Sequence, residues 1–231
     1  MSLPHGRWSR AAALAFGCAL LAACGTPRSA VRGPAAVVPA GSAVRPGALQ
    51  ERLVSSAQGF VGKRTVEVGR RVFVPDCTGL VLAIYYAVGL DLERVYPRYR
   101  GNGVVRLHSA LEDAKLVRRT ATPEAADLIF WDNTYDENED GKWNDALTHV
   151  AMVMEVDRLG TVVYVHYNYR RGVVLEQMNL RRPSLAGERG PGGAWVPLNS
   201  PMRMAGTFAP GDPTLAGELF RDFGHAWRLP L

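Results

Sequence analysis

Residues 76–81 read Asp76-Cys77-Thr78-Gly79-Leu80-Val81 and open the most informative segment of the chain. From Cys77 to Val88 apolar side chains recur every three or four positions, and Gly89 follows as a natural stop. This spacing predicts a helix with one buried face. Asp76 is a residue type that accepts hydrogen bonds from the unpaired N–H groups of a helix start, so Cys77 is expected in the first turn.

The position of Cys77 has two explanations. The positive end of a helix dipole favours a thiolate over a thiol, and the N–H groups of the first turn can stabilise an oxyanion on an attacked carbonyl. A free Cys on an apolar stripe is also often a small core residue. The helix alone leaves both interpretations open.

Two histidines favour the first explanation. His149 begins one apolar strand pattern and His166 ends the next, with a turn at residues 157–160 between them. In a pair of antiparallel strands the start of one lies beside the end of the other, so the two histidines are expected to be neighbours. A base that deprotonates Cys77 and a group that orients the base are the general form of a catalytic triad. Each histidine could instead be a core residue, or the three side chains could bind a metal, although their spacing is not typical of zinc ligands.

The first 23 residues have the pattern of a targeting segment. A short basic region precedes an apolar run over residues 11–21 that is too short for a permanent membrane helix. The run Leu21-Ala22-Ala23-Cys24-Gly25 resembles a lipobox, which implies cleavage before Cys24 and lipidation of Cys24. An ordinary signal peptide cut after Ala23 is the alternative. The expected location is the cell envelope, anchored by lipid, and in a host with two membranes Gly25 favours the outer membrane facing the periplasm.

Composition divides the rest of the chain. Residues 24–46 are expected to be the lipidated Cys and a tether, because an Ala- and Pro-rich stretch without acidic residues cannot bury a core. Residues 47–183 are expected to form the catalytic domain, and residues 184–231 an irregular extension that wraps it, with a short helix over 215–223. The net charge of +5 falls to +3 (5 − 2) without Arg7 and Arg10. The absence of a basic run with interleaved aromatics speaks against a nucleic-acid partner.

The order of the elements indicates the fold class. Helical patterns cover residues 49–61, 77–88 and 108–115, and strand patterns follow at 126–131, 149–156, 162–167 and 172–178. Helices first and strands afterwards favour an α+β fold with an antiparallel sheet.

Four motifs in this order resemble the NlpC/P60 peptidoglycan peptidases. Residues 76–81 are similar to the family's D-C-S/T-G-L-V signature, and residues 126–131, 148–153 and 165–173 are similar to its three strand motifs. The resemblance covers about Gln50 to Gln177 and implies a papain-like fold, with N-terminal helices packed on a central antiparallel sheet. CHAP amidases share this fold and also use a Cys/His pair.

The resemblance also implies roles. Cys77 would be the nucleophile, His149 the general base and His166 the orienting residue, while Asp76 and Thr78 would line the substrate pocket. The implied protein is a monomeric, lipid-anchored thiol hydrolase that cleaves an amide in the peptide part of peptidoglycan, and its partners are the stem peptides. No cofactor is required for this chemistry. A CHAP-type amidase and a non-catalytic envelope-binding lipoprotein are the alternatives.

An acidic insertion has a pattern of its own. Asp136, Asn138, Asp140 and Asn144 fit the first, third, fifth and ninth positions of a calcium loop. The twelfth position is Leu147 rather than a bidentate Glu, so a structural calcium ion would bind weakly. A solvated acidic turn is the alternative.

Overall fold

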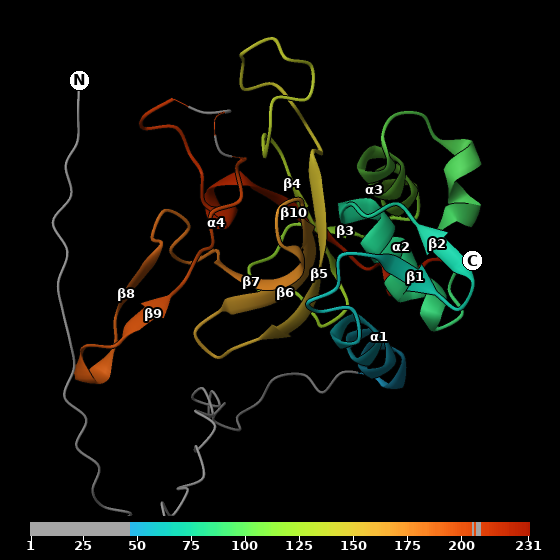
Figure 1. Ribbon diagram of the computed structural model, residues 1–231, viewed down its shortest axis with the longest axis horizontal. Coiled ribbons are helices and arrows are strands. Elements are labelled where there is room, and N and C mark those ends of the chain that lie inside the picture. The colour runs from blue at the N-terminus through green and yellow to red at the C-terminus, as the bar shows by residue number, and fades with distance from the viewer. Residues whose placement is uncertain (1–46, 205, 207–208) are drawn as a thin grey trace, which may run out of the picture. The chain divides into compact units, whose positions relative to one another are not determined.

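The computed structural model describes residues 47–204, 206 and 209–231 (Figure 1). The predictions for residues 1–46, including the lipidation of Cys24, lie outside this part. The described chain begins with helix α1 (Ala48–Gln58), the hairpin of β1 (Val66–Val68) and β2 (Arg71–Phe73), and helix α2 (Cys77–Ala87). A 3-10 helix η1 (Leu92–Arg98) and helix α3 (Gly103–Asp113) follow.

An antiparallel sheet occupies the centre of the described residues. Its strand order is β3-β10-β4-β5-β6-β7, and every pair is antiparallel. The strands are β3 (Val117–Arg118), β4 (Leu128–Trp131), β5 (His149–Val156), β6 (Thr161–Asn168), β7 (Gly172–Asn179) and β10 (Phe220–Gly224). The α+β class with an antiparallel sheet is therefore confirmed.

The start of α2 is fixed by two local contacts. Asp76 is extended and its Oδ1 accepts a hydrogen bond from the N–H of Gly79 at 2.7 Å. Such a cap stabilises a helix by about 1 kcal/mol. A Cβ at Gly79 would lie 1.9 Å from the carbonyl oxygen of Val74, so only glycine fits there. These contacts hold Cys77 as the first residue of α2.

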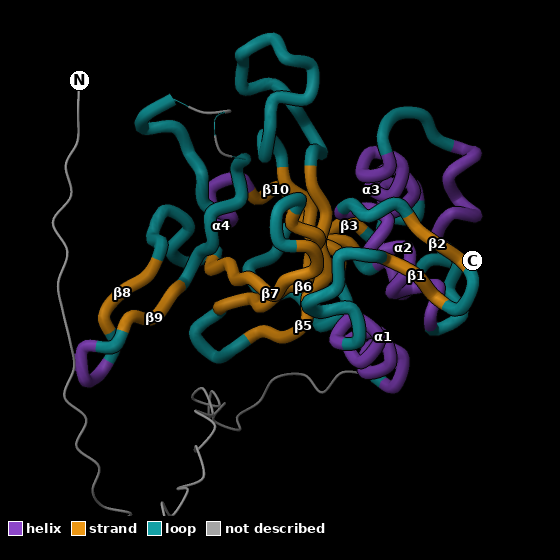
Figure 2. The backbone as a smooth tube through the Cα atoms, viewed as in Figure 1, coloured by secondary structure: helices purple, strands orange, loops and turns teal. Residues whose placement is uncertain are grey.

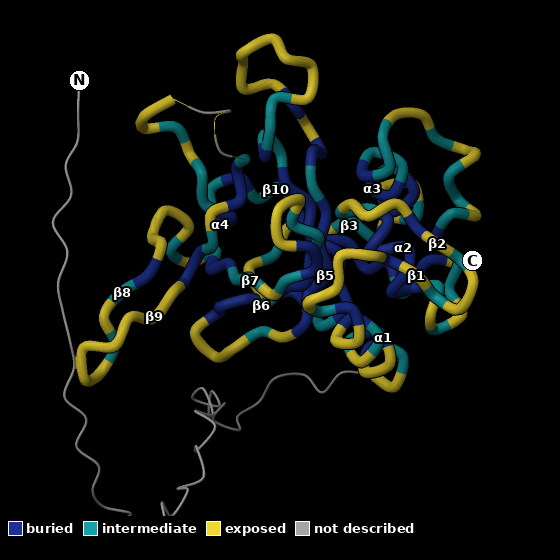
Figure 3. Tube along the Cα trace, viewed as in Figure 1, coloured by how far each residue is buried: buried dark blue, intermediate teal, exposed yellow. Residues whose placement is uncertain are grey.

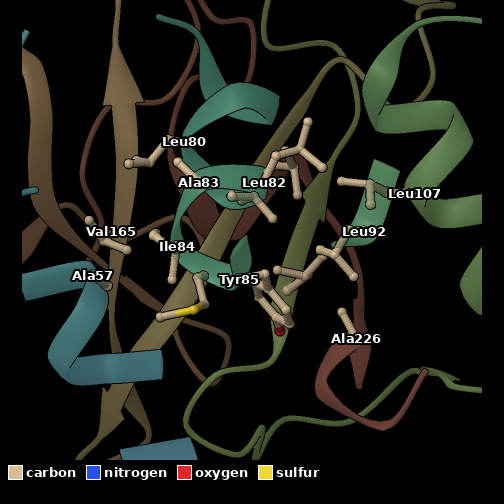
Figure 4. Packing of buried hydrophobic residues seen from close by; sticks show 14 of the residues in the cluster. Ala57, Leu80, Leu82, Ala83, Ile84, Tyr85, Leu92, Leu107, Val165 and Ala226 are labelled. Atoms are coloured by element: carbon tan, nitrogen blue, oxygen red, sulfur yellow. The ribbon is translucent and has the colours of Figure 1, made fainter. Parts of the chain in front are cut away.

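The two faces of the sheet bury different parts of the chain. Along β4, Leu128 and Phe130 belong to the core beneath the N-terminal helices, whereas Ile129 and Trp131 belong to a second core on the opposite face. This alternation follows from the two-residue period of a strand. Figure 4 shows α2 side chains, including Leu80, packed among residues of neighbouring elements in the first core.

The C-terminal segment differs from its prediction. The predicted helix over residues 215–223 is a short helix α4 (Ala216–Leu219) followed by β10, which lies between β3 and β4. Besides covering the second face of the sheet, residues 184–231 therefore supply an internal strand. The side chains of His225 and Trp227 donate to Oδ1 of Asp127 at 2.6 and 2.9 Å, which ties the chain after β10 to the domain.

Several element bounds also differ. Helix α3 starts at Gly103, five residues before the predicted start, because Asn102 caps it by accepting from the N–H of Val105. The sequence patterns missed β1, β2 and β3, and also the hairpin of β8 (Gly187–Arg189) and β9 (Trp195–Pro197), whose turn contains η2 (Pro191–Gly193). This hairpin extends away from the main sheet (Figure 2). A last 3-10 helix, η3, spans Ala226–Arg228.

Candidate active site

A cleft of about 950 Å³ contains all five residues predicted to act on a substrate. They are Asp76, Cys77, Thr78, His149 and His166. The other walls come from the start of α3, the loop between β4 and β5, the turn between β6 and β7, Leu175 and Glu176 of β7, and residues 200–204. The volume falls in the range of about 300–1,000 Å³ that is usual for ligand sites.

Cys77 is half-buried and is the only cysteine within the described residues. Its Sγ lies 4.0 Å from Oγ1 of Thr78. The backbone N–H of Cys77 belongs to the first helical turn, where N–H groups have no acceptor inside the helix. A nucleophilic sulfur and a donor for an oxyanion are thus provided by one residue.

His149 and His166 are in contact, as the strand pairing predicts. Nε2 of His149 lies 2.9 Å from Nδ1 of His166, and the ring centroids are 5.1 Å apart in an edge-to-face arrangement. The ring of His149 also lies 5.8 Å, centroid to centroid, from that of Trp131 on the neighbouring strand. Because Nε2 of His149 faces His166, Nδ1 is the ring nitrogen left for a proton from another group.

Glu176 was not among the predicted site residues, but it lines the same cleft and contacts His166. Its Oε2 lies 3.1 Å from Nε2 of His166, and its Oε1 is held by the guanidinium of Arg171. Burial alone raises the pKa of this carboxyl, but the contacts with His166 and Arg171 outweigh burial, so the pKa of Glu176 is lowered. The carboxylate is therefore charged at neutral pH.

The electrostatics of Cys77 differ from the sequence expectation of a thiolate. Burial raises the pKa of the Cys77 thiol to about 11, and the negative charge of Asp76 acts in the same direction. Hydrogen bonds with the backbone of Val150 and with Thr78 lower the pKa only in part. Burial and Asp76 thus favour the neutral thiol of Cys77 over the thiolate.

His149 is suited to receive that proton. Burial of the ring, and then the positive charge that His166 can carry, lower the pKa of His149 well below its ordinary value. The imidazole is therefore neutral near pH 7 and has a lone pair that can accept a proton, but the lowered pKa makes it a weaker base than a free imidazole. Both pKa shifts favour the uncharged forms of Cys77 and His149.

Asp76→Asn should make Cys77 more reactive. Asn can still accept from the N–H of Gly79, so the cap remains, but the charge that raises the pKa of Cys77 is lost. A fall of one pKa unit would raise the thiolate fraction about tenfold near neutral pH, and the alkylation rate about threefold, because nucleophilicity falls with pKa. The rate with iodoacetamide, followed at Cys77 by peptide mass spectrometry, measures this. Asp113→Asn, on exposed α3 surface, is the control, and an unchanged or slower rate in Asp76→Asn contradicts the electrostatic explanation.

The acidic insertion forms an exposed loop between β4 and β5 (Figure 3). The carboxylate of Asp136 accepts from the N–H groups of Asp140 and Gly141, and Asn144 donates to Asp140 at 2.9 Å. No group of three or more His, Cys, Asp or Glu side chains that could hold a metal ion occurs in the described chain. A calcium site formed by Asp136, Asn138, Asp140 and Asn144 stays a prediction.

Among the helices of residues 47–204, 206 and 209–231, none has the length and apolar character needed to cross a membrane.

Comparisons with known proteins do not show which family this chain belongs to. No family model matches the sequence, and neither does any curated protein. One solved structure, of a protein described as similar to a lipoprotein of the NLP/P60 family from Staphylococcus aureus subsp. aureus Mu50, is similar at 21% identity. The similarity covers 54% of this chain and 35% of that chain, with a TM-score of 0.31. A likeness of this size assigns neither a family nor an activity.

Proposed function

We propose that the protein is a lipid-anchored cysteine hydrolase that cleaves an amide bond in the peptide part of peptidoglycan. The observation that carries the proposal is the shared cleft of Cys77 and the hydrogen-bonded pair of His149 and His166. The order of the NlpC/P60-like motifs supports the substrate class, and on that resemblance we infer a papain-like arrangement of the domain.

The first half of the reaction forms an acyl-enzyme. Nδ1 of His149 takes the proton of the Cys77 thiol as Sγ attacks the amide carbon. The carbonyl oxygen becomes an oxyanion, which the N–H of Cys77 is placed to stabilise. The C–N bond then breaks, the proton on His149 passes to the leaving amine, and a thioester remains on Cys77.

The second half uses water. His149 takes a proton from the attacking water, and the new tetrahedral intermediate breaks its C–S bond. The product leaves as a carboxylic acid, and the proton on His149 returns to the sulfur. His166, hydrogen-bonded to Nε2, keeps the ring of His149 in place through both halves.

A covalent trap tests this mechanism against a non-catalytic envelope-binding protein. The full-length protein is incubated with a stem-peptide analogue whose scissile amide is replaced by a nitrile, which accepts a thiolate and has no leaving group. The expected result is an adduct on Cys77 that also appears at reduced rate in His149→Ala. Absence of an adduct at Cys77 contradicts the proposal.

We further propose that Cys24 carries the lipid. Several acyl chains each contribute about 0.8 kcal/mol per buried methylene, which makes anchoring stable. Cys24→Ser should therefore move most of the protein from the membrane fraction to the soluble fraction while wall hydrolysis by the purified protein is unchanged. Cys18→Ser, a change of the same kind six positions earlier, should leave the protein in the membrane fraction. Retention of the Cys24→Ser variant in membranes would show that another feature anchors it.

A further inference from the structure

Glu176 lines the cleft and is the last member of a row of contacting side chains that runs from His149 through His166. The side chains of His166 and Glu176 are 4% and 7% exposed, so solvent hardly screens their contact. One carboxylate oxygen faces Nε2 of His166 at 3.1 Å and also accepts from the hydroxyl of Tyr164 at 3.4 Å. The other oxygen is bound by Arg171, so the carboxylate is held from both ends.

The contact between Glu176 and His166 depends on charge more than on alignment. Nε2 of His166 makes no well-aligned hydrogen bond within the described residues, although the carboxylate oxygen is at contact distance. A negative oxygen at 3.1 Å attracts a ring N–H and repels a ring lone pair. The hydrogen of a neutral His166 is therefore favoured on Nε2, which leaves Nδ1 as an acceptor.

This preference passes to the next ring. An accepting Nδ1 on His166 requires Nε2 of His149 to carry the hydrogen of their 2.9 Å contact. Neutral His149 then has its lone pair on Nδ1, the nitrogen that is free to take the proton of Cys77. In the reverse arrangement both hydrogens move to Nδ1, and His149 presents an N–H instead of a base.

We propose that Glu176 is a positioning residue that sets the hydrogen-bond direction through both histidines, so that His149 keeps a proton-accepting Nδ1 for Cys77. The catalytic consequence rests on the proposed hydrolase function, whereas the ring tautomers do not. Arg171 supports the arrangement because it binds the carboxylate oxygen that His166 does not face.

Glu176→Gln tests the direction with almost no change of shape. Arg171 has only donors, so it should keep the amide oxygen, and the amide N–H2 should then face Nε2 of His166. That contact favours a lone pair on Nε2 and reverses both tautomers. Nitrogen-15 NMR of full-length protein labelled at histidine distinguishes the two states, with signals assigned through His149→Gln and His166→Gln.

The expected result is hydrogen on Nε2 of both rings in the native protein and on Nδ1 of His166 in Glu176→Gln. Hydrogen on Nδ1 of His166 in the native protein overturns the proposal, even if the variant fails to fold. Unchanged tautomers in a folded Glu176→Gln protein overturn it as well. Glu155→Gln is the same change at an exposed position of β5 and should leave the histidine signals unchanged. Reversed tautomers of His149 and His166 in Glu155→Gln would also contradict the role of Glu176.

Kinetics provide the second readout. Glu176→Gln should lower kcat/KM roughly 10- to 100-fold while KM changes little. Losses of about this size are typical when the hydrogen-bond partner that orients a metal-binding histidine is removed. If the native protein cleaves no wall peptide but its tautomers respond as described, the proposed function fails and the positioning role stands. If the wall is cleaved and the tautomers do not respond, the positioning role fails alone.

Discussion

Cys77→Ala should abolish wall hydrolysis, with a loss of at least about 10³-fold, because Cys77 is the only thiol among the described residues that line the cleft. The variant removes one sulfur from a half-buried position at the start of α2. The Asp76 cap and the close packing of Gly79 do not involve that sulfur, so the fold should be retained. Release of soluble peptide from purified wall measures the activity, and circular dichroism with a thermal melt checks the fold.

The control for this experiment is Thr78→Ala, the neighbouring position. Its hydroxyl lies 4.0 Å from Sγ and its loss removes a similar volume without removing the nucleophile. It should retain measurable activity. Hydrolysis near the native rate in a folded Cys77→Ala protein would rule out Cys77 as the nucleophile.

His149→Ala should lower kcat by about 10²- to 10⁴-fold, the usual contribution of a general base. Since the Cys77 thiol has a pKa of about 11, little thiolate forms without a base near neutral pH. The loss should shrink as pH rises toward that pKa, because hydroxide then supplies the thiolate that His149 otherwise generates. The pH dependence of kcat in both proteins measures this, and added imidazole should partly restore the variant.

Two outcomes would contradict this role of His149. A rate within a few-fold of native near neutral pH would mean that another group takes the proton. A loss that is the same at every pH, without rescue by imidazole, would indicate that the ring only supports the structure around the cleft.

Local periodicity predicted the elements that carry the site. The apolar spacing after Cys77 predicted α2, and the turn at residues 157–160 predicted the antiparallel pair that brings His149 to His166. Strand β10 could not be found in this way. Its five residues, Phe220–Gly224, pair with β3 and β4, which lie about a hundred positions earlier, and the spacing of Leu215, Leu219 and Phe223 fits a helix equally well.

Glu176 was missed although the sequence contained a signal for it. Asn168 pairs with Gly172 at the end of the β6–β7 turn, and this register places Glu176 opposite Tyr164. His166 pairs with Val174, and Glu176 lies two positions further along β7. Such diagonal neighbours are within reach of each other, so Glu176 can contact His166. The protonation state of Cys77 was harder to predict from the sequence, because the helix start alone favours a thiolate. The burial that raises the pKa of the thiol depends on the packing of the whole domain.

Digestion of purified peptidoglycan in water enriched in oxygen-18 tests the central claim most directly. Each cut by the full-length native protein should create a new amine on one fragment and a new carboxyl on the other, with a single heavy oxygen in that carboxyl, because water resolves the thioester on Cys77. Cys77→Ala should release none. Fragments cut only in the glycan, or the same labelled peptide ends released by Cys77→Ala, would contradict the account.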